Sequence, residues 1–146
     1  MPVRDATLSD VEEICSLIEE HAVYEGKHDL KHDRAKMARH LFGDDPKAWV
    51  VLAYPEGEPE TVAGFVFCSW NFSTWEGEPG IWMDDLYLRP EYRGLGLARQ
   101  LMADLRTRTE GRIVWEMQQG NDTAAAFYTQ LGALPVNDWT LYRWKQ

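Results

Sequence analysis

Residues 80–103 constrain the fold of this chain more than any other part of the sequence. Residues 81–88 are dense in apolar and aromatic side chains that favour a strand, and Pro90 ends that strand. From Leu97 onward, leucines recur every four positions, which is the spacing of a helix. The sequence therefore predicts a strand, a short turn and a glycine-rich loop that opens directly into a helix.

The junction between this strand and helix has the chemistry of an anion-binding loop. Its glycines allow the backbone to approach a ligand closely, and the first N–H groups of the helix have no partner within it. These donors and the helix dipole favour an anion such as phosphate, to which Arg93 and Arg99 could add charge-assisted hydrogen bonds. A tight connection without a ligand is the alternative. The loop is neither a Walker loop nor a dinucleotide fingerprint, because Gly-Lys-Ser/Thr and Gly-x-Gly-x-x-Gly are absent.

Composition indicates one folded domain over residues 1–146. Hydrophobic residues make up 45% of the chain, which argues against disorder. No window approaches a membrane span, and the first residues hold no apolar signal core. Cys15 and Cys68 lie far apart without metal-ligand spacing, so we expect two reduced core thiols in a cytoplasmic protein.

The net charge of −9 argues against a nucleic-acid partner. Phosphate backbones need a basic footprint, and this chain has 24 acidic residues against 15 basic ones. Acidic surfaces can attract small cations, although most only aid solubility. The charge is therefore weak support for an amine substrate.

Periodicity and capping signals predict a mixed order of strands and helices. Thr7, Asp33 and Asn121 are predicted to cap helices. The expected strands are residues 2–5, 48–54, 61–70, 81–88, 112–117 and 141–144; the expected helices are residues 7–24, 33–42, 97 onward and 121–131; residues 71–79 are expected to form a loop. This order predicts an α/β protein with a mixed sheet covered by helices.

Several motifs together resemble the GNAT family of N-acetyltransferases over essentially the whole chain. They are Arg4-x-Ala6-Thr7-x-x-Asp10, Gly64-Phe65, the loop Arg93-x-x-Gly96-x-Ala98, and Asn121-x-x-Ala124-x-x-Phe127-Tyr128-x-x-Leu131-Gly132-Ala133. A closer likeness is to the spermidine/spermine branch, which includes thialysine and diamine acetyltransferases. It is carried by Leu17-Ile18-Glu19-Glu20, Tyr24-Glu25, Trp75 and Met83-Asp84-Asp85-Leu86.

The resemblance implies acetyl-CoA as cosubstrate and assigns residues to hold it. Main-chain amides of the loop would bind the pyrophosphate, and Asn121 would touch the pantetheine arm. The main chain at Leu86 and Leu88 would pair with pantetheine, with the Leu86 N–H polarising the thioester carbonyl. The implied acetyl-CoA residues are Leu86, Leu88, Arg93, Gly94, Leu95, Gly96, Leu97, Ala98, Arg99, Asn121 and Tyr128.

Acetyl transfer to an amine needs a base and an acid. A lysine-like amine has a pKa near 10.4, so only about one molecule in 10³ is neutral at pH 7. Asp84 is the candidate base, directly or through water, and Tyr128 is the candidate acid that protonates the departing CoA thiolate. Side-chain alternation puts Asp84 and Asp85 on opposite faces unless a bulge intervenes. Structural pairing for the carboxylates and aromatic packing for Tyr128 are the alternatives.

The branch likeness implies a substrate site made of carboxylates and aromatic rings, which suit an extended cation. Its candidates are Tyr24, Glu25, Trp75, Asp84 and Asp85. His21, His28, His32 and His40 form no convincing ligand set, so we expect solvent-facing histidines and no metal. The branch is usually dimeric, which implies a homodimer.

The sequence therefore predicts a cytoplasmic N-acetyltransferase that acts by direct transfer in a ternary complex. The expected substrate is a small polyamine, diamine or lysine-like amine. Two alternatives stay open: an acetyltransferase for another small amine, such as an amino acid, an aminoglycoside or a xenobiotic, and a non-catalytic acyl-CoA sensor. A sensor would keep the loop but would need neither Asp84 nor Tyr128.

Overall fold

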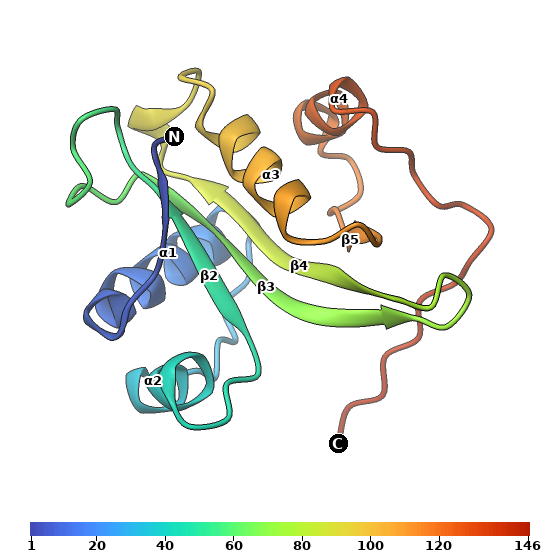
Figure 1. The fold of residues 1–146 in the computed structure, drawn as a ribbon, viewed down its shortest axis with the longest axis horizontal. Helices are drawn as coiled ribbons and strands as arrows, with labels where there is room; N and C mark the ends of the chain where they lie inside the picture. The colour runs from blue at the N-terminus through green and yellow to red at the C-terminus, as the bar shows by residue number, and fades with distance from the viewer. The chain divides into compact units, whose positions relative to one another are not determined.

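The computed structural model describes residues 1–146, which fold as two compact units (Figure 1). The first unit is Met1–Glu116 and the second is Met117–Gln146. Each is described by itself below. No helix in either unit combines the length and the apolar character that crossing a membrane requires.

The first unit is built on a five-stranded mixed sheet. Its strands follow the order of the chain: β1 (Val3–Asp5), β2 (Trp49–Ala53), β3 (Gly64–Ser73), β4 (Glu78–Leu88) and β5 (Ile113–Trp115). Neighbours are antiparallel except β4 and β5, which are parallel. The mixed α/β sheet expected from the sequence is confirmed.

Three helices cover the two faces of this sheet. They are α1 (Val11–Tyr24), α2 (Arg34–Phe42) and α3 (Leu97–Arg108). Two of the expected caps form: the Thr7 N–H donates to Asp10 Oδ2 at 2.8 Å, and the Lys36 N–H donates to Asp33 Oδ1 at 2.7 Å. Local polar signals thus fix where α1, with its leading 3-10 turn, and α2 begin.

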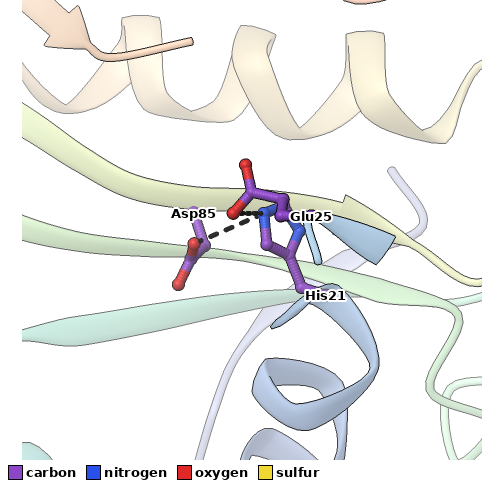
Figure 2. Close-up of side chains that lie close together, drawn as sticks. All are labelled: His21, Glu25 and Asp85. Atoms are coloured by element: carbon purple, nitrogen blue, oxygen red, sulfur yellow. Dashed lines mark ion pairs between the residues drawn. The ribbon is translucent and has the colours of Figure 1, made fainter. Parts of the chain in front are cut away.

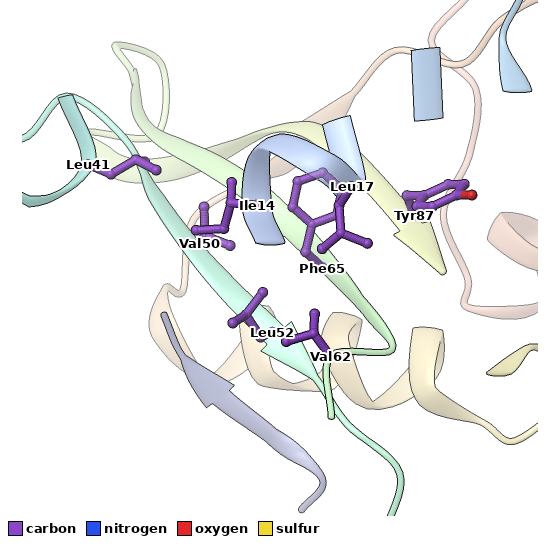
Figure 3. Close-up of a cluster of buried hydrophobic side chains, with 8 residues drawn as sticks. All are labelled: Ile14, Leu17, Leu41, Val50, Leu52, Val62, Phe65 and Tyr87. Atoms are coloured by element: carbon purple, nitrogen blue, oxygen red, sulfur yellow. The ribbon is translucent and has the colours of Figure 1, made fainter. Parts of the chain in front are cut away.

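Alternating strand residues supply the core on each face. Under α1 and α2, one cluster joins the helices to the sheet (Figure 3); it comprises Ile14, Leu17, Leu41, Val50, Leu52, Val62, Phe65 and Tyr87. Val51, Val66 and Cys68 alternate with those strand residues and are buried on the opposite side. The buried stripe of α3 is Leu97, Leu101, Met102 and Leu105.

The β3–β4 hairpin is longer than the sequence predicts. Residues 71–79 were expected to be a loop, but Asn71, Phe72 and Ser73 pair with Gly80, Pro79 and Glu78. Cross-strand pairing extends both strands, since pairing rather than local propensity decides where a hairpin ends. Only residues 74–77 remain as the turn, closed by Gly77 at a φ of +68°.

Strand β4 contains a bulge at Asp84. Phe67 pairs with Asp85 and Cys68 pairs with Met83, so Asp84 is an extra residue with no partner on β3. The main-chain hydrogen bonds on either side of Asp84 are consistent with this bulge. The Ile81 N–H donates to Arg112 O beside β5, whereas the Arg89 N–H donates to Ala63 O on the β3 side. Ile81 and Arg89 are an even number of positions apart, so their N–H groups would point to the same edge of a regular strand. They point to opposite edges because the bulge shifts the alternation of the main-chain groups between them.

The second unit contains α4 (Asp122–Gln130). The Ala124 N–H donates to Asn121 Oδ1 at 3.2 Å, which confirms the predicted cap. Gly132 follows the helix at a φ of +92°. The strand predicted at residues 141–144 is wrong: a strand needs a hydrogen-bonded neighbour, and no strand of this chain pairs with these residues.

Replacing Phe65 by Ala should lower the free energy of unfolding by about 3–5 kcal/mol, because its fully buried ring would leave a cavity. Phe72→Ala is the matched control: that ring is 60% exposed, and its loss should cost far less. Urea denaturation followed by circular dichroism measures both. Equal losses for the two variants would contradict the assigned core.

Candidate active site

One edge of β4 is left open beyond the end of β5. The parallel pairing to β5 covers only Ile81, Trp82 and Met83. Past the bulge, the Arg89 N–H points toward β3. Leu86 and Leu88 are an odd number of positions from Arg89, so their main-chain N–H and C=O groups point toward the opposite edge of the strand. Arg93 Nε donates to the Leu88 carbonyl at 3.0 Å. The main chain at Leu86 and Leu88 therefore faces the edge that β5 does not cover.

The glycine loop leads from this edge into α3. Gly94 and Gly96 have φ values of +81° and +79°, where a side chain would strain the backbone. Gly96 is the residue from which α3 begins, and the Gln100 N–H donates to its carbonyl at 3.1 Å. The N–H groups of residues 97–99 therefore have no acceptor within the helix. The loop has the backbone geometry of an anion site.

The side chain of Arg93 is held by the protein itself. Its guanidinium lies 5.5 Å from the centre of the Tyr24 ring and 5.6 Å from that of Tyr87. These cation–π contacts join the loop to α1 and β4. Arg99 is exposed on the first turn of α3, as are Gly94, Leu95 and Gly96 in the loop.

Asp84 and Asp85 line the same cavity, because the bulge in β4 is the exception under which side-chain alternation does not separate them. The cavity has a volume of about 190 Å³, and both residues line it. Its apolar walls are Ile18, Leu30, Met37 and Phe67. Lys31 and His32, from the segment between α1 and α2, complete it. The extra residue reverses the alternation at this point, and a bulge leaves no mark in the sequence.

Burial raises the pKa of Asp85 to about 6. The negative charges of Asp84 and Glu25 act in the same direction, whereas His21 and Lys27 oppose them. The Asp84 carboxylate is exposed, and the indole Nε1 of Trp82 donates to it at 3.4 Å. The two neighbouring carboxylates thus have different environments.

His21 lies between two of the predicted substrate residues (Figure 2). Its Nε2 is 3.1 Å from Glu25 Oε1 and 3.6 Å from Asp85 Oδ1, while its Nδ1 is buried without a partner. The side chain is only 14% exposed, so the expectation of a solvent-facing histidine is wrong here. The spacing of four between His21 in the last turn of α1 and Glu25 at its C-cap was a visible signal of their contact. The contact with Asp85 depends on how α1 packs on β4.

Tyr24 and Trp75, two other predicted substrate residues, lie in different parts of the first unit. Tyr24 ends α1, and its ring lies 6.2 Å from that of His21. Trp75 lies in the β3–β4 turn, 82% exposed, and is not among the residues that line the cavity. The structure therefore brings Tyr24, Glu25, Asp84 and Asp85 to one region of the first unit, together with His21, but does not bring Trp75 to their cavity.

Asn121 and Tyr128 belong to the second unit. Asn121 uses its side-chain oxygen to cap α4, and Tyr128 lies on that helix with its carbonyl accepting from the Ala133 N–H at 3.1 Å. The ring centres of Phe127 and Tyr128 are 5.6 Å apart. Asn121 thus lies at the N-terminal cap of α4, and Tyr128 lies within the helix.

Both cysteines are poor nucleophiles. Cys15 and Cys68 are buried and free. Burial raises the pKa of both thiols, that of Cys68 to about 12. A thiol attacks as the thiolate, so neither residue has the environment of a covalent catalyst.

Comparison with known proteins identifies a family and two named relatives. The model of the acetyltransferase (GNAT) family matches residues 11–133. A thialysine N-epsilon-acetyltransferase from Bos taurus is 32% identical over 106 residues, covering 68% of this chain and 62% of that protein. An L-ornithine N5-acetyltransferase from Arabidopsis thaliana is 30% identical over 86 residues, covering 56% of this chain and 38% of that protein. The chain thus spans less than two thirds of the length of either relative.

A solved structure has the same fold. An aminoglycoside acetyltransferase from an uncultured soil metagenomic sample, in complex with sisomicin, matches with a TM-score of 0.77 at 14% identity. The match covers 99% of this chain and 95% of that one. At this identity the likeness concerns the fold alone, and it confirms the α/β fold that the resemblance to GNAT proteins implies.

Replacing Asp85 by Asn should stabilise the protein at pH 7. The raised pKa means that the folded state binds the proton of Asp85 more tightly than the unfolded state, whose value is near 3.8. This contribution to stability is complete below pH 4 and is lost as the pH rises from about 4 to about 6. Asn cannot ionise, so it avoids that loss, and the gain at pH 7 should be about 1–3 kcal/mol.

Urea denaturation of wild type and Asp85→Asn at pH 4 and pH 7 measures this effect. The difference between the two proteins should be large at pH 7 and small at pH 4. Asp45→Asn is the control: Asp45 is exposed and its pKa is lowered by Lys47, so no such gain is expected. A difference between wild type and Asp85→Asn that is the same at both pH values would contradict the assignment.

Proposed function

The chain belongs to the acetyltransferase (GNAT) family, and from this we propose that it transfers an acetyl group from acetyl-CoA to the primary amine of a small polyamine, diamine or lysine-like substrate. The observation that carries the proposal is the meeting of two carboxylates at the β4 bulge, beside an open strand edge and a glycine loop. The amine-binding site and the acyl-CoA site would then share strand β4.

The first unit has groups that suit acetyl-CoA. The N–H groups of residues 97–99, which have no acceptor within α3, and the positive end of the α3 dipole would hold the pyrophosphate. The main chain at Leu86 and Leu88 faces the open edge and would pair with the pantetheine arm, with the Leu86 N–H as donor to the thioester carbonyl. The resemblance to the GNAT family also implies a contact of Asn121 with the pantetheine arm.

In the proposed mechanism, Asp84 accepts a proton from the substrate ammonium, directly or through water. The neutral nitrogen attacks the thioester carbonyl, the C–S bond breaks, and Tyr128 gives its proton to the sulfur of CoA. The nitrogen then releases its second proton, Tyr128 regains a proton and Asp84 gives up the one it accepted, so that the amide, CoA thiol and one proton are the products. Direct transfer is favoured over a covalent acetyl-enzyme because both cysteines are buried as thiols.

Glu25, Asp85 and Tyr24 would hold the ammonium groups of the substrate. Both carboxylates lie close to the same nitrogen of His21, Nε2, and the Tyr24 ring is next to that of His21. The names of the bovine and Arabidopsis relatives support a lysine-like amine, since thialysine and ornithine both carry a side-chain amine. Trp75 would contribute only by contacting a substrate that extends beyond the cavity. A cytoplasmic homodimer is part of the proposal, on the likeness to the polyamine branch.

The test is release of CoA from acetyl-CoA with a panel of amines. The panel comprises spermidine, spermine, putrescine, thialysine, lysine, an aminoglycoside and a histone-like peptide. Saturable release with a polyamine, a diamine or a lysine-like amine is the expected result. Turnover only with an aminoglycoside or the peptide would keep acetyl transfer but reject this substrate class. Tight acetyl-CoA binding without turnover would favour a sensor.

Replacing Tyr128 by Phe should separate an enzyme from a sensor. The variant lacks the phenol that would protonate CoA, so kcat should fall about 10²–10⁴-fold while the Kd for CoA stays within a few fold. Tyr142→Phe, in the same unit and 90% exposed, is the matched control and should keep wild-type kcat. Unchanged turnover in Tyr128→Phe would contradict the proposed acid.

A further inference from the structure

Three side chains that can ligate a metal ion meet where the end of α1 packs against β4 (Figure 2). They are His21, Glu25 and Asp85, and one ligand atom from each lies within 4.8 Å of the other two. His21 Nε2 is their common neighbour, 3.1 Å from Glu25 Oε1 and 3.6 Å from Asp85 Oδ1. The sequence predicts no ligand set around its histidines, because nothing in it places Asp85 beside α1. The packing of α1 on β4 creates the set.

The separations between these atoms match those that a zinc ion requires of its ligands. Zinc bonds to a histidine nitrogen or a carboxylate oxygen are about 2.0–2.2 Å long, so two ligand atoms at a tetrahedral angle lie about 3.3–3.6 Å apart. The two distances from His21 Nε2, 3.1 Å and 3.6 Å, agree with this range to within a few tenths of an ångström. Small side-chain rotations would therefore bring all three atoms to one ion.

The surrounding structure holds the three ligands in place. His21 and Glu25 are four residues apart at the end of α1, so they lie on the same face of the helix. The Tyr87 ring meets the His21 ring edge-on, with their centres 5.3 Å apart. The side chains of His21, Glu25 and Asp85 are only 14%, 21% and 21% exposed. Binding an ion would thus cost little side-chain entropy.

The charge of the cluster favours a divalent cation. Glu25 and Asp85 contribute two carboxylates close together, whereas Lys27, at 3.8 Å from Glu25 Oε1, is 61% exposed and can turn its ammonium toward solvent. An imidazole nitrogen suits Zn²⁺ and neighbouring transition metals, whereas Mg²⁺ and Ca²⁺ prefer oxygen ligands alone. The set of one nitrogen and two oxygens therefore favours a transition metal.

His21 also indicates that the ion would exchange readily. A metal on Nε2 leaves the ring proton on Nδ1, which is buried without a hydrogen-bond partner. Zinc-bound histidines usually donate this proton to a carboxylate or a carbonyl, which strengthens the bond to the metal. The absence of that bond favours a reversible site over a permanently bound ion.

We propose that His21, Glu25 and Asp85 form a reversible binding site for a divalent transition-metal ion, with Zn²⁺ as the best match in bond length and ligand preference. Three protein ligands leave a fourth position for water. Glu25 and Asp85 are also the carboxylates proposed to hold ammonium groups, so the ion and the amine would exclude each other. This consequence rests on the proposed function, whereas the site itself does not.

Calorimetric titration of the purified protein with ZnCl₂, after treatment with a chelator and in a buffer that does not bind metal, tests the site. Wild type should bind one Zn²⁺ per chain. His21→Gln, Glu25→Gln and Asp85→Asn should each weaken binding at least about 100-fold, because losing an outer partner of a ligand already costs about 10–100-fold. Circular dichroism would establish that each variant is folded. A large excess of Mg²⁺ should change the Kd for Zn²⁺ only slightly.

His32→Gln is the matched control. His32 is also little exposed and lies 3.8 Å from a carboxylate oxygen of Glu19, but these two residues are not part of the cluster. This variant should keep the wild-type Kd to within a few fold. The site would be overturned by a wild type that binds no Zn²⁺, by unchanged affinity in any one of the three folded ligand variants, or by displacement of Zn²⁺ by Mg²⁺.

Putrescine separates this inference from the proposed function. At pH 7 nearly all of it is doubly protonated, so it is a mimic of the substrate cation and not a metal ligand. A Kd for Zn²⁺ that rises in saturating putrescine would support both the metal site and its overlap with the amine. A Kd that stays the same would support the metal site and remove Glu25 and Asp85 from the proposed amine site. Turnover of amines by a protein that binds no Zn²⁺ would reject the metal site and retain the enzyme.

Discussion

A single extra residue in β4 determines how the candidate site residues of the first unit are placed. Without the bulge at Asp84, the two neighbouring carboxylates would alternate onto opposite faces of the sheet. With it, both line one cavity, and the main chain that follows turns Leu86 and Leu88 toward the edge that β5 leaves open. The bulge therefore positions both the carboxylates proposed to act on the amine and the main chain proposed to bind the thioester.

The site concentrates charge that the fold must stabilise. His21 lies between Glu25 and Asp85, and Lys27 lies 3.8 Å from Glu25. These contacts offset the repulsion among the acidic groups, yet the pKa of Asp85 still rises to about 6. Asp85 is partly buried, and carboxylates with raised pKa values cluster at binding and catalytic sites.

Features with local causes could be predicted from the sequence. The caps at Asp33 and Asn121 and the glycine loop before α3 each depend on a few adjacent residues, and all three form as expected. Features that depend on pairing could not. The bulge, the extension of β3 to Ser73 and the contact of His21 with Asp85 all depend on distant strands or helices. The strand expected at residues 141–144 failed because its apolar residues have no partner strand.

The most direct test of the central claim, that Asp84 and Asp85 serve one amine site, is a double-mutant cycle on kcat/KM. It would compare Asp84→Asn, Asp85→Asn and the double variant with wild type, using thialysine at saturating acetyl-CoA. Groups that act on the same ligand are not additive, so the double variant should lose at least 10-fold less than the product of the single losses. Losses that multiply exactly as independent effects would contradict a shared site.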